Sequence, residues 1–64
     1  MSEPLFDVLA VEFKTKRVRR IAEDKRKADA EAIVAMAVMR RGVELEYFVT
    51  APAGRYHDGD SYAL

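Results

Sequence analysis

One segment of the chain, residues 26 to 41, constrains the fold more than any other. It is filled with Ala, Met, Lys, Arg and Glu, which are good helix formers, and Gly42 follows at the point where a left-handed residue ends a helix. Asp29 lies in the first turns and two arginines in the last turn, as the helix dipole favours. Asp24 is the best candidate for the N-cap. The sequence therefore predicts one helix over 26–41.

The segments on either side of this helix read as strands. Residues 5–13 are rich in Val, Leu and Phe and apolar on both faces in their first half, which is typical of a central strand. A second strand is expected around 18–22 and a third over 43–51, where Pro52 ends it. The fold class is therefore α+β, a small β-β-α-β layer with one helix packed on a three-stranded, mainly antiparallel sheet.

The length of the chain allows a single domain, residues 1–64. We expect its ordered part to span about 4–52, with the tail 53–64 partly ordered through Tyr56 and Tyr62 and flexible elsewhere. The chain has no cysteine, which excludes disulfides and thiolate metal sites, so its stability must come from a good core or from an oligomer. No export signal or membrane span is recognisable, and we expect a cytoplasmic protein.

The predicted helix is apolar on two sides. One side is a normal core stripe, made of Ala30, Ile33, Val34, Ala37 and Val38. Opposite to it lies a second apolar surface, the Ala/Met face, made of Ala28, Ala32, Ala35, Met36 and Met39. A lone surface helix normally carries charge on its outer side. Either these small and flexible residues are simply tolerated at the surface, or, as we favour, the Ala/Met face is buried against a second molecule.

The sheet gives a second reason to expect self-association. Phe6, Val8 and Phe48 are assigned to an apolar sheet face, and one helix can cover only one face of a sheet. A short chain without disulfides gains most from burial between copies. We therefore predict a homo-oligomer, a dimer in the simplest case, whose interface combines the Ala/Met face with these three residues.

Positive charge is concentrated in one stretch, although the formal net charge of the chain is zero. A β-bulge at Arg19-Arg20 is expected, because it would bring Val18 and Ile21 to one face and turn both arginines outward. The stretch would then form a basic rim along one end and edge of the sheet. Its members are Lys14, Lys16, Arg17, Arg19, Arg20, Lys25, Arg26 and Lys27.

Three interpretations of this basic rim stay open. It is suited to contacts with nucleic-acid phosphates, although the zero net charge and the lack of an aromatic residue within 14–27 weaken that reading. Basic residues also protect edge strands and balance acids on neighbouring strands, here Glu12, Glu44 and Glu46. The third interpretation is an acidic protein partner.

No residue pattern predicts catalysis, a metal or a cofactor. His57, Asp58 and Asp60 share one Gly-containing loop, which is more typical of a turn than of a metal site. The chain has no Gly-rich phosphate loop and no nucleophile beside a plausible base. We therefore predict a small non-enzymatic oligomeric binding protein that contacts nucleic-acid phosphates through its basic rim. The alternative is a protein-interaction module, an adaptor or inhibitor of bacterial or phage type, acting through the Ala/Met face or a sheet edge.

Overall fold

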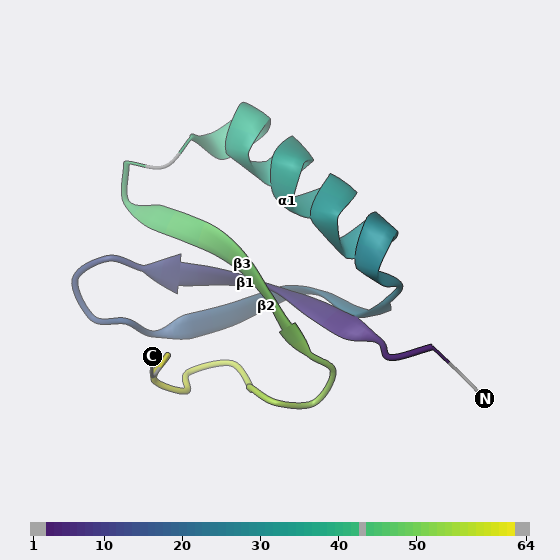
Figure 1. The fold of residues 1–64 in the computed structure, drawn as a ribbon. Helices are drawn as coiled ribbons and strands as arrows, with labels where there is room; N and C mark the ends of the chain where they lie inside the picture. The colour runs from purple at the N-terminus through teal and green to yellow at the C-terminus, as the bar shows by residue number, and fades with distance from the viewer. Residues whose placement is uncertain (1–2, 43, 63–64) are drawn as a thin grey trace.

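Three strands and one helix follow one another in the predicted order. A computed structural model describes residues 3–42 and 44–62 of the chain. Its elements are β1 (Phe6–Glu12), β2 (Val18–Lys25), α1 (Lys27–Arg41) and β3 (Glu46–Pro52). The strands are antiparallel and the helix packs on the sheet, which confirms the α+β, β-β-α-β prediction (Figure 1). The expected start of the third strand, Val43, lies outside the described residues, as does the end of the tail, 63–64.

β1 is the central strand, as its two apolar faces predict. The sheet has the order β2-β1-β3, and β1 is paired without interruption to β3 from Phe6↔Pro52 to Glu12↔Glu46. Its pairing with β2 is interrupted twice, between Phe6 and Val8 and between Val8 and Leu9. Four consecutive side chains of β1, from Val8 to Val11, are essentially inaccessible to solvent. The side chains of this strand therefore form the centre of the core.

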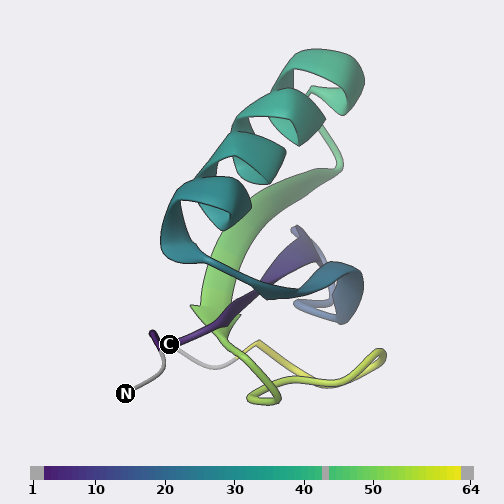
Figure 2. The same cartoon turned by 90° about the vertical axis from the view of Figure 1, so that its right-hand side faces the viewer.

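Two different covers bury the two faces of the sheet. α1 lies over the face that carries Val8, Ala10 and Phe48, and the chain after β3 lies under the opposite face (Figure 2). That opposite face, with the tail, holds the main core cluster of Leu9, Val11, Val18, Ala51 and Tyr56. The sequence interpretation that one face would be left open was wrong, because it did not count the tail as a cover.

The tail is a structured part of the fold through residue 62. Ala53 N–H donates to Leu5 O at 3.0 Å, and Tyr62 N–H donates to Lys16 O at 2.8 Å, so both ends of the tail are tied to the sheet. Three tyrosine rings are in contact along this side: the centroids of Tyr56 and Tyr62 are 5.3 Å apart in a tilted pair, and those of Tyr62 and Tyr47 are 6.3 Å apart in an edge-to-face pair. The ordered part therefore extends beyond the expected limit near residue 52.

The helix begins and ends close to the predicted residues. Gly42 has a φ of 72° and donates its N–H to Val38 O at 2.9 Å, which confirms the predicted stop. The N-cap is Arg26, without a side-chain cap, and not the expected Asp24. Asp24 has a φ of 52° and belongs to the irregular end of β2. Within the described residues, no helix is both long and apolar enough to cross a membrane.

Candidate interaction surfaces

The eight basic residues do not form one continuous rim. Lys14, Lys16 and Arg17 lie at the turn between β1 and β2, which we call the turn cluster. The run 25–27 lies where β2 passes into α1. The strand between them has eight residues, and at about 3.3 Å per residue it separates the two groups by roughly 25 Å. The two groups therefore lie at opposite ends of β2 (Figure 1).

Arg19, in the middle of the predicted rim, is bound to an acid on β3. Its partner across the ladder is Ala10 of the central strand. The Arg19 guanidinium donates to Glu46 Oε1 of β3 at 3.2 Å. Arg41 at the end of the helix lies 4.0 Å from the same carboxylate. Arg19 therefore links the two outer strands of the sheet, and its charge is matched within the chain.

Arg20 is also engaged with acids of its own chain. Its Nη2 lies 2.9 Å from Glu23 and its Nη1 3.9 Å from Asp7, while Asp58 accepts its backbone N–H at 2.7 Å. The β-bulge that we expected at Arg19-Arg20 instead falls at Ile21, because Val8 pairs with Ala22 and Leu9 with Arg20. Val18 and Ile21 therefore lie on opposite faces, and Arg20 is partly covered rather than turned outward.

The turn cluster has no ion pair among the described residues. Lys16 places its Nζ 5.4 Å from the centre of the Tyr47 ring, at a cation–π distance. At the other end of β2, Arg26 lies 3.9 Å from Glu3, and both side chains are about three-quarters exposed. The turn cluster thus groups three exposed cations that form no ion pair with the described residues.

The aspartate of β1 was missed by the sequence analysis. Asp7 is 1% exposed, and its two carboxylate oxygens accept hydrogen bonds from Asp24 N–H at 3.1 Å and Gly54 N–H at 3.0 Å. It therefore joins the irregular end of β2 and the first turn of the tail to the central strand. The signal in the sequence was an acid within an apolar run, which is unexpected in a buried strand unless its oxygens are satisfied.

The Ala/Met face is exposed in the single chain. Met36 is 52% and Met39 86% accessible, and Ala28, Ala32 and Ala35 are also exposed. Beside this face, between α1 and β2, runs an apolar groove of about 290 Å³ with two arginines at one end. Its lining, which we call the α1–β2 groove, consists of Ile21, Ile33, Met36, Ala37, Arg40 and Arg41. Of the predicted core stripe only Ala30 is fully buried.

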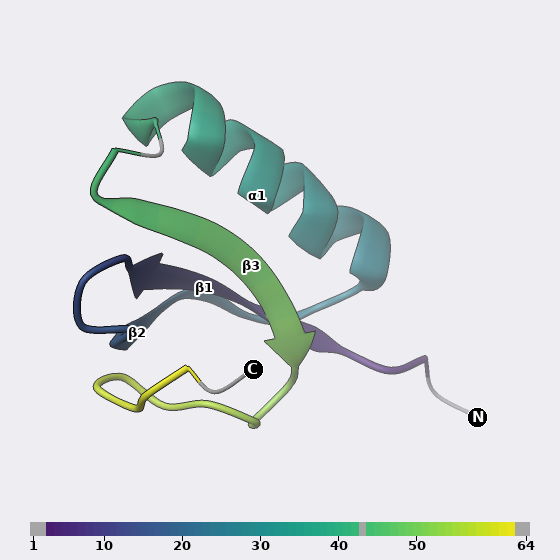
Figure 3. The ribbon, with the colours of Figure 1, turned by 60° about the vertical axis from the view of Figure 1, so that its left-hand side comes forward.

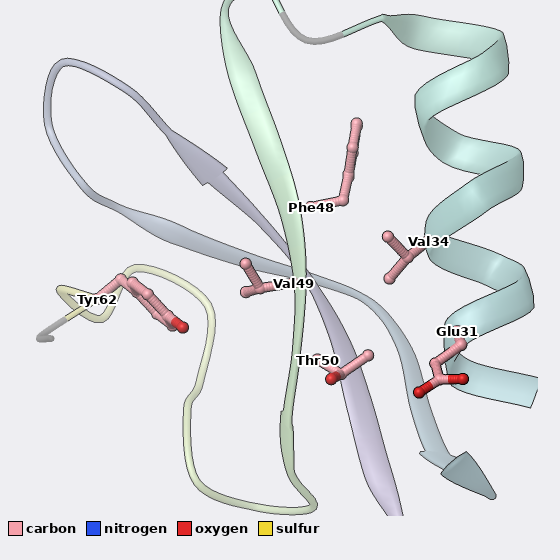
Figure 4. A pocket seen from close by; sticks show the side chains of 6 residues that line it. All are labelled: Glu31, Val34, Phe48, Val49, Thr50 and Tyr62. Atoms are coloured by element: carbon pink, nitrogen blue, oxygen red, sulfur yellow. The ribbon is translucent and has the colours of Figure 1, made fainter. Parts of the chain in front are cut away.

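The three sheet residues assigned to the oligomer interface lie under the helix. Val8 is 0% and Phe48 7% exposed, and Phe6 is partly buried. Figure 4 shows Phe48 and Val34 on the same side of β3, facing each other across the space between strand and helix. Val8 and Phe48 therefore have no exposed surface to offer a second chain while α1 is in place, because the chain covers them itself.

A second cleft follows the outer edge of β3. It has a volume of about 440 Å³ and is lined by Glu31 and Val34 of the helix, by residues 48–50 of β3, and by Tyr62 of the tail. Figure 4 shows that Val49 and Tyr62 lie on the other side of the strand from Val34. A cleft lined from both faces of one strand is an open depression along the edge of that strand, not an enclosed chamber.

The loop that carries His57 is held in place by hydrogen bonds to two aspartate side chains. Asp60 accepts the backbone N–H of His57 at 2.8 Å, and Asp58 holds the N–H of Arg20. The described residues contain no group of three His, Cys, Asp or Glu side chains placed to hold a metal ion. Asp58 therefore fastens the tail to β2, and the Asp60 carboxylate closes a turn within the tail.

Comparison with known protein families, with characterised proteins and with solved structures finds no match for this chain.

Proposed function

We propose that this chain is a non-enzymatic protein-interaction module that binds an apolar, acid-flanked segment of another protein in the α1–β2 groove. The observation that carries the proposal is the half-exposed Met36 in a groove whose other apolar walls are Ile21, Ile33 and Ala37. Methionine adapts to partners of irregular shape, and an exposed apolar groove beside the still more exposed Met39 is the kind of surface on which an amphipathic segment docks.

The charges at the groove indicate the partner's chemistry. Arg40 and Arg41 lie at one end of the groove. Arg41 Nη1 is 4.0 Å from Glu46 Oε1, at the distance limit of an ion pair. Arg40 has no ion pair among the described residues. Carboxylates that flank the apolar part of a bound segment would meet these guanidinium groups and fix its direction.

Selection from a displayed library of random peptides tests the proposal. We expect the selected peptides to share apolar anchors next to Asp or Glu, and to lose binding to the Met36→Glu variant. This substitution places an acid four residues before Arg40 on an exposed helix position, so the fold should tolerate it. Leu45→Glu is the matched control, because Leu45 is 80% exposed and lies outside the groove. Peptides that bind Met36→Glu as well as the original chain would contradict the proposal.

Nucleic-acid binding by the turn cluster is a second candidate. It rests on three exposed cations without an acidic partner in the described chain, next to the ring of Tyr47. A titration of a fluorescent single-stranded oligonucleotide against salt is the direct test. If phosphate contacts carry binding, Lys16→Glu weakens it and flattens its salt dependence, whereas Lys27→Glu at the other end of β2 has little effect. Equal effects of the two changes would argue against a localised site.

The oligomer remains part of the proposal, but at another surface than the sequence suggested. We assign the Ala/Met side of the helix to the partner protein, and place self-association at the edge of the sheet. The cytoplasm remains the proposed location.

A further inference from the structure

The outer edge of β3 carries backbone groups that point away from the sheet. Phe13 N–H donates to Leu45 O at 3.1 Å and Ala53 N–H to Leu5 O at 3.0 Å. At both ends of this ladder, the odd-numbered residues on the β3 side therefore direct their backbone N–H and C=O groups toward β1. The register between β1 and β3 is unbroken. In an antiparallel pair the direction alternates from residue to residue. Glu46, Phe48 and Thr50 therefore direct their N–H and C=O groups outward.

Nothing in the described chain covers this edge. The backbone hydrogen bonds outside the ladders involve none of these three residues. β3 has few of the usual protections of an edge strand, since it has no bulge and no Lys or Arg, its one charged residue, Glu46, is paired with Arg19, and its proline stands at its last residue. Figure 3 shows β3 at the near side of the sheet, with α1 above it and the tail below. Such an edge is a template for another strand.

We propose that a second copy of this chain occupies this edge. The two β3 strands pair antiparallel around a two-fold axis at Phe48, and the two sheets become one sheet of six strands. This inference concerns a different surface from the α1–β2 groove and goes beyond the function proposed for it.

Hydrogen-bond geometry selects the register. Only residues whose backbone groups point outward can bond across the new ladder, and these are the even residues 46, 48 and 50. Pairing Phe48 with its own copy also pairs Glu46 with Thr50 of the other chain, twice, so all three residues are used on each side. A shift by two residues leaves one of the three without a partner, and a shift by four leaves two.

The side chains are complementary in this register. No like charges face each other, because Glu46 stands opposite Thr50 and its own charge is already matched by Arg19 at 3.2 Å. On the other face, Tyr47 stands opposite Val49 of the second chain, an aromatic and β-branched pair of the kind that stabilises sheets. Pro52 ends the pairing because it has no N–H to donate.

The helices suit the same arrangement. α1 and β3 lie side by side, so a two-fold axis at Phe48 brings the two helices to one face of the joined sheet, running in opposite directions. Glu31, which lines the cleft along the outer edge of β3, then lies on the side of α1 that is turned toward the other helix. Ala35 and Val38 lie on the same side of the helix as Glu31, four and seven residues further on. Val38 is 38% exposed, and the second helix would cover it.

Sedimentation of the full chain at micromolar concentrations tests the proposal. We expect the mass of two 7.3 kDa chains, and protection of the Glu46, Phe48 and Thr50 amides from hydrogen exchange that grows with concentration. Thr50→Pro removes one outward donor from each chain at an exposed edge position, where proline is tolerated, and should give a folded monomer. A monomer mass for the original chain overturns the proposal, and so does an undiminished Thr50→Pro dimer.

Two charge variants at Thr50 test the register. Thr50→Glu places an acid opposite Glu46 of the other chain at two equivalent positions, one on each side of the two-fold axis. It should weaken the dimer on the order of tenfold. Thr50→Lys faces the same two acids and should dimerise at least as well as the original chain. A nuclear Overhauser contact between Tyr47 Hα and Val49 Hα in a mixed-label dimer reports the register directly, since these residues share a strand and are not close within one chain. Equal effects of Glu and Lys contradict this register.

The same variants separate the two proposals. Met36→Glu should abolish peptide binding and leave the dimer mass unchanged, because its position lies outside the β3 cleft. Thr50→Glu should weaken the dimer and leave peptide binding per chain unchanged. If Met36→Glu dissociates the dimer, the Ala/Met face is the self-association surface and the β3 pairing is wrong.

Discussion

The two edges of the sheet differ in whether another segment of the chain bonds to their outer backbone. At β2, the tail supplies backbone partners, because Val18 donates to Asp60 O at 2.9 Å and accepts from Gly59 N–H at 2.8 Å. Two irregularities interrupt this strand, and basic residues flank it. At β3 the strand is regular, and no described segment lies against its outer backbone. The chain thus uses its last described residues to protect one edge and leaves the other available.

The difference between the edges reflects how many residues are needed to cover one of them. The edge of β2 is covered by the tail, residues 53–62, which is a large share of a 64-residue chain. The buried Asp7 holds both the start of this tail and the end of β2. The same tail also covers the sheet face opposite the helix, so one segment protects an edge and completes the core. Within residues 3–42 and 44–62, no segment is hydrogen-bonded to the outer backbone of β3. The second copy that we propose would cover this edge without any additional segment of the chain.

The largest effect is expected from loss of the anchor of the tail. Tyr56 is 8% exposed within the main core cluster, and Tyr56→Ala should lower the free energy of unfolding by about 3–5 kcal/mol. The β2 edge should then open, so the amide of Val18 should exchange its hydrogen faster. Urea unfolding, at one fixed protein concentration, and hydrogen exchange measure the two effects.

His57→Ala is the control for this change. It alters the neighbouring residue, whose side chain is 69% exposed, and should change stability by less than about 0.5 kcal/mol. If Tyr56→Ala leaves the exchange of the Val18 amide unchanged, the tail does not depend on Tyr56 to protect β2, and the contrast between the edges loses its basis.

A smaller effect is expected at the buried carboxylate. Asp7→Asn keeps the shape of the side chain but turns an amide NH₂ toward one of two backbone donors, Asp24 N–H or Gly54 N–H. Leaving a buried donor unsatisfied should lower the free energy of unfolding by about 1–3 kcal/mol. Asp58→Asn, at an exposed acceptor for one bond, should cost less. Urea unfolding of both variants, again at one concentration, gives the comparison, and an equal loss would show that burial of Asp7 adds nothing.

The sequence predicted the elements well because local chemistry determines them. The helix over 27–41 follows from its composition and from Gly42, and the central position of β1 follows from its two apolar faces. The Ala/Met face is exposed in the single chain, as the second apolar side of the helix suggested, and whether a partner covers it stays a prediction.

The candidate sites depended on contacts between distant segments. Whether Arg19 is free for a ligand depends on Glu46, which is 27 residues away and accepts a hydrogen bond from its guanidinium. The same holds for Phe48, whose burial depends on the face to which α1 docks. Residue periodicity assigns side chains to a face but does not say what covers that face.

The sequence by itself determined that this chain forms three strands and one helix with apolar side chains on every face, because propensity and the period of apolar residues act over short distances. Only the tertiary structure decided that the tail covers one sheet face and one edge, that the bulge falls at Ile21, and that the basic stretch is divided along β2. These outcomes depend on which distant groups satisfy one another, and that balance of packing and hydrogen bonds is set in three dimensions.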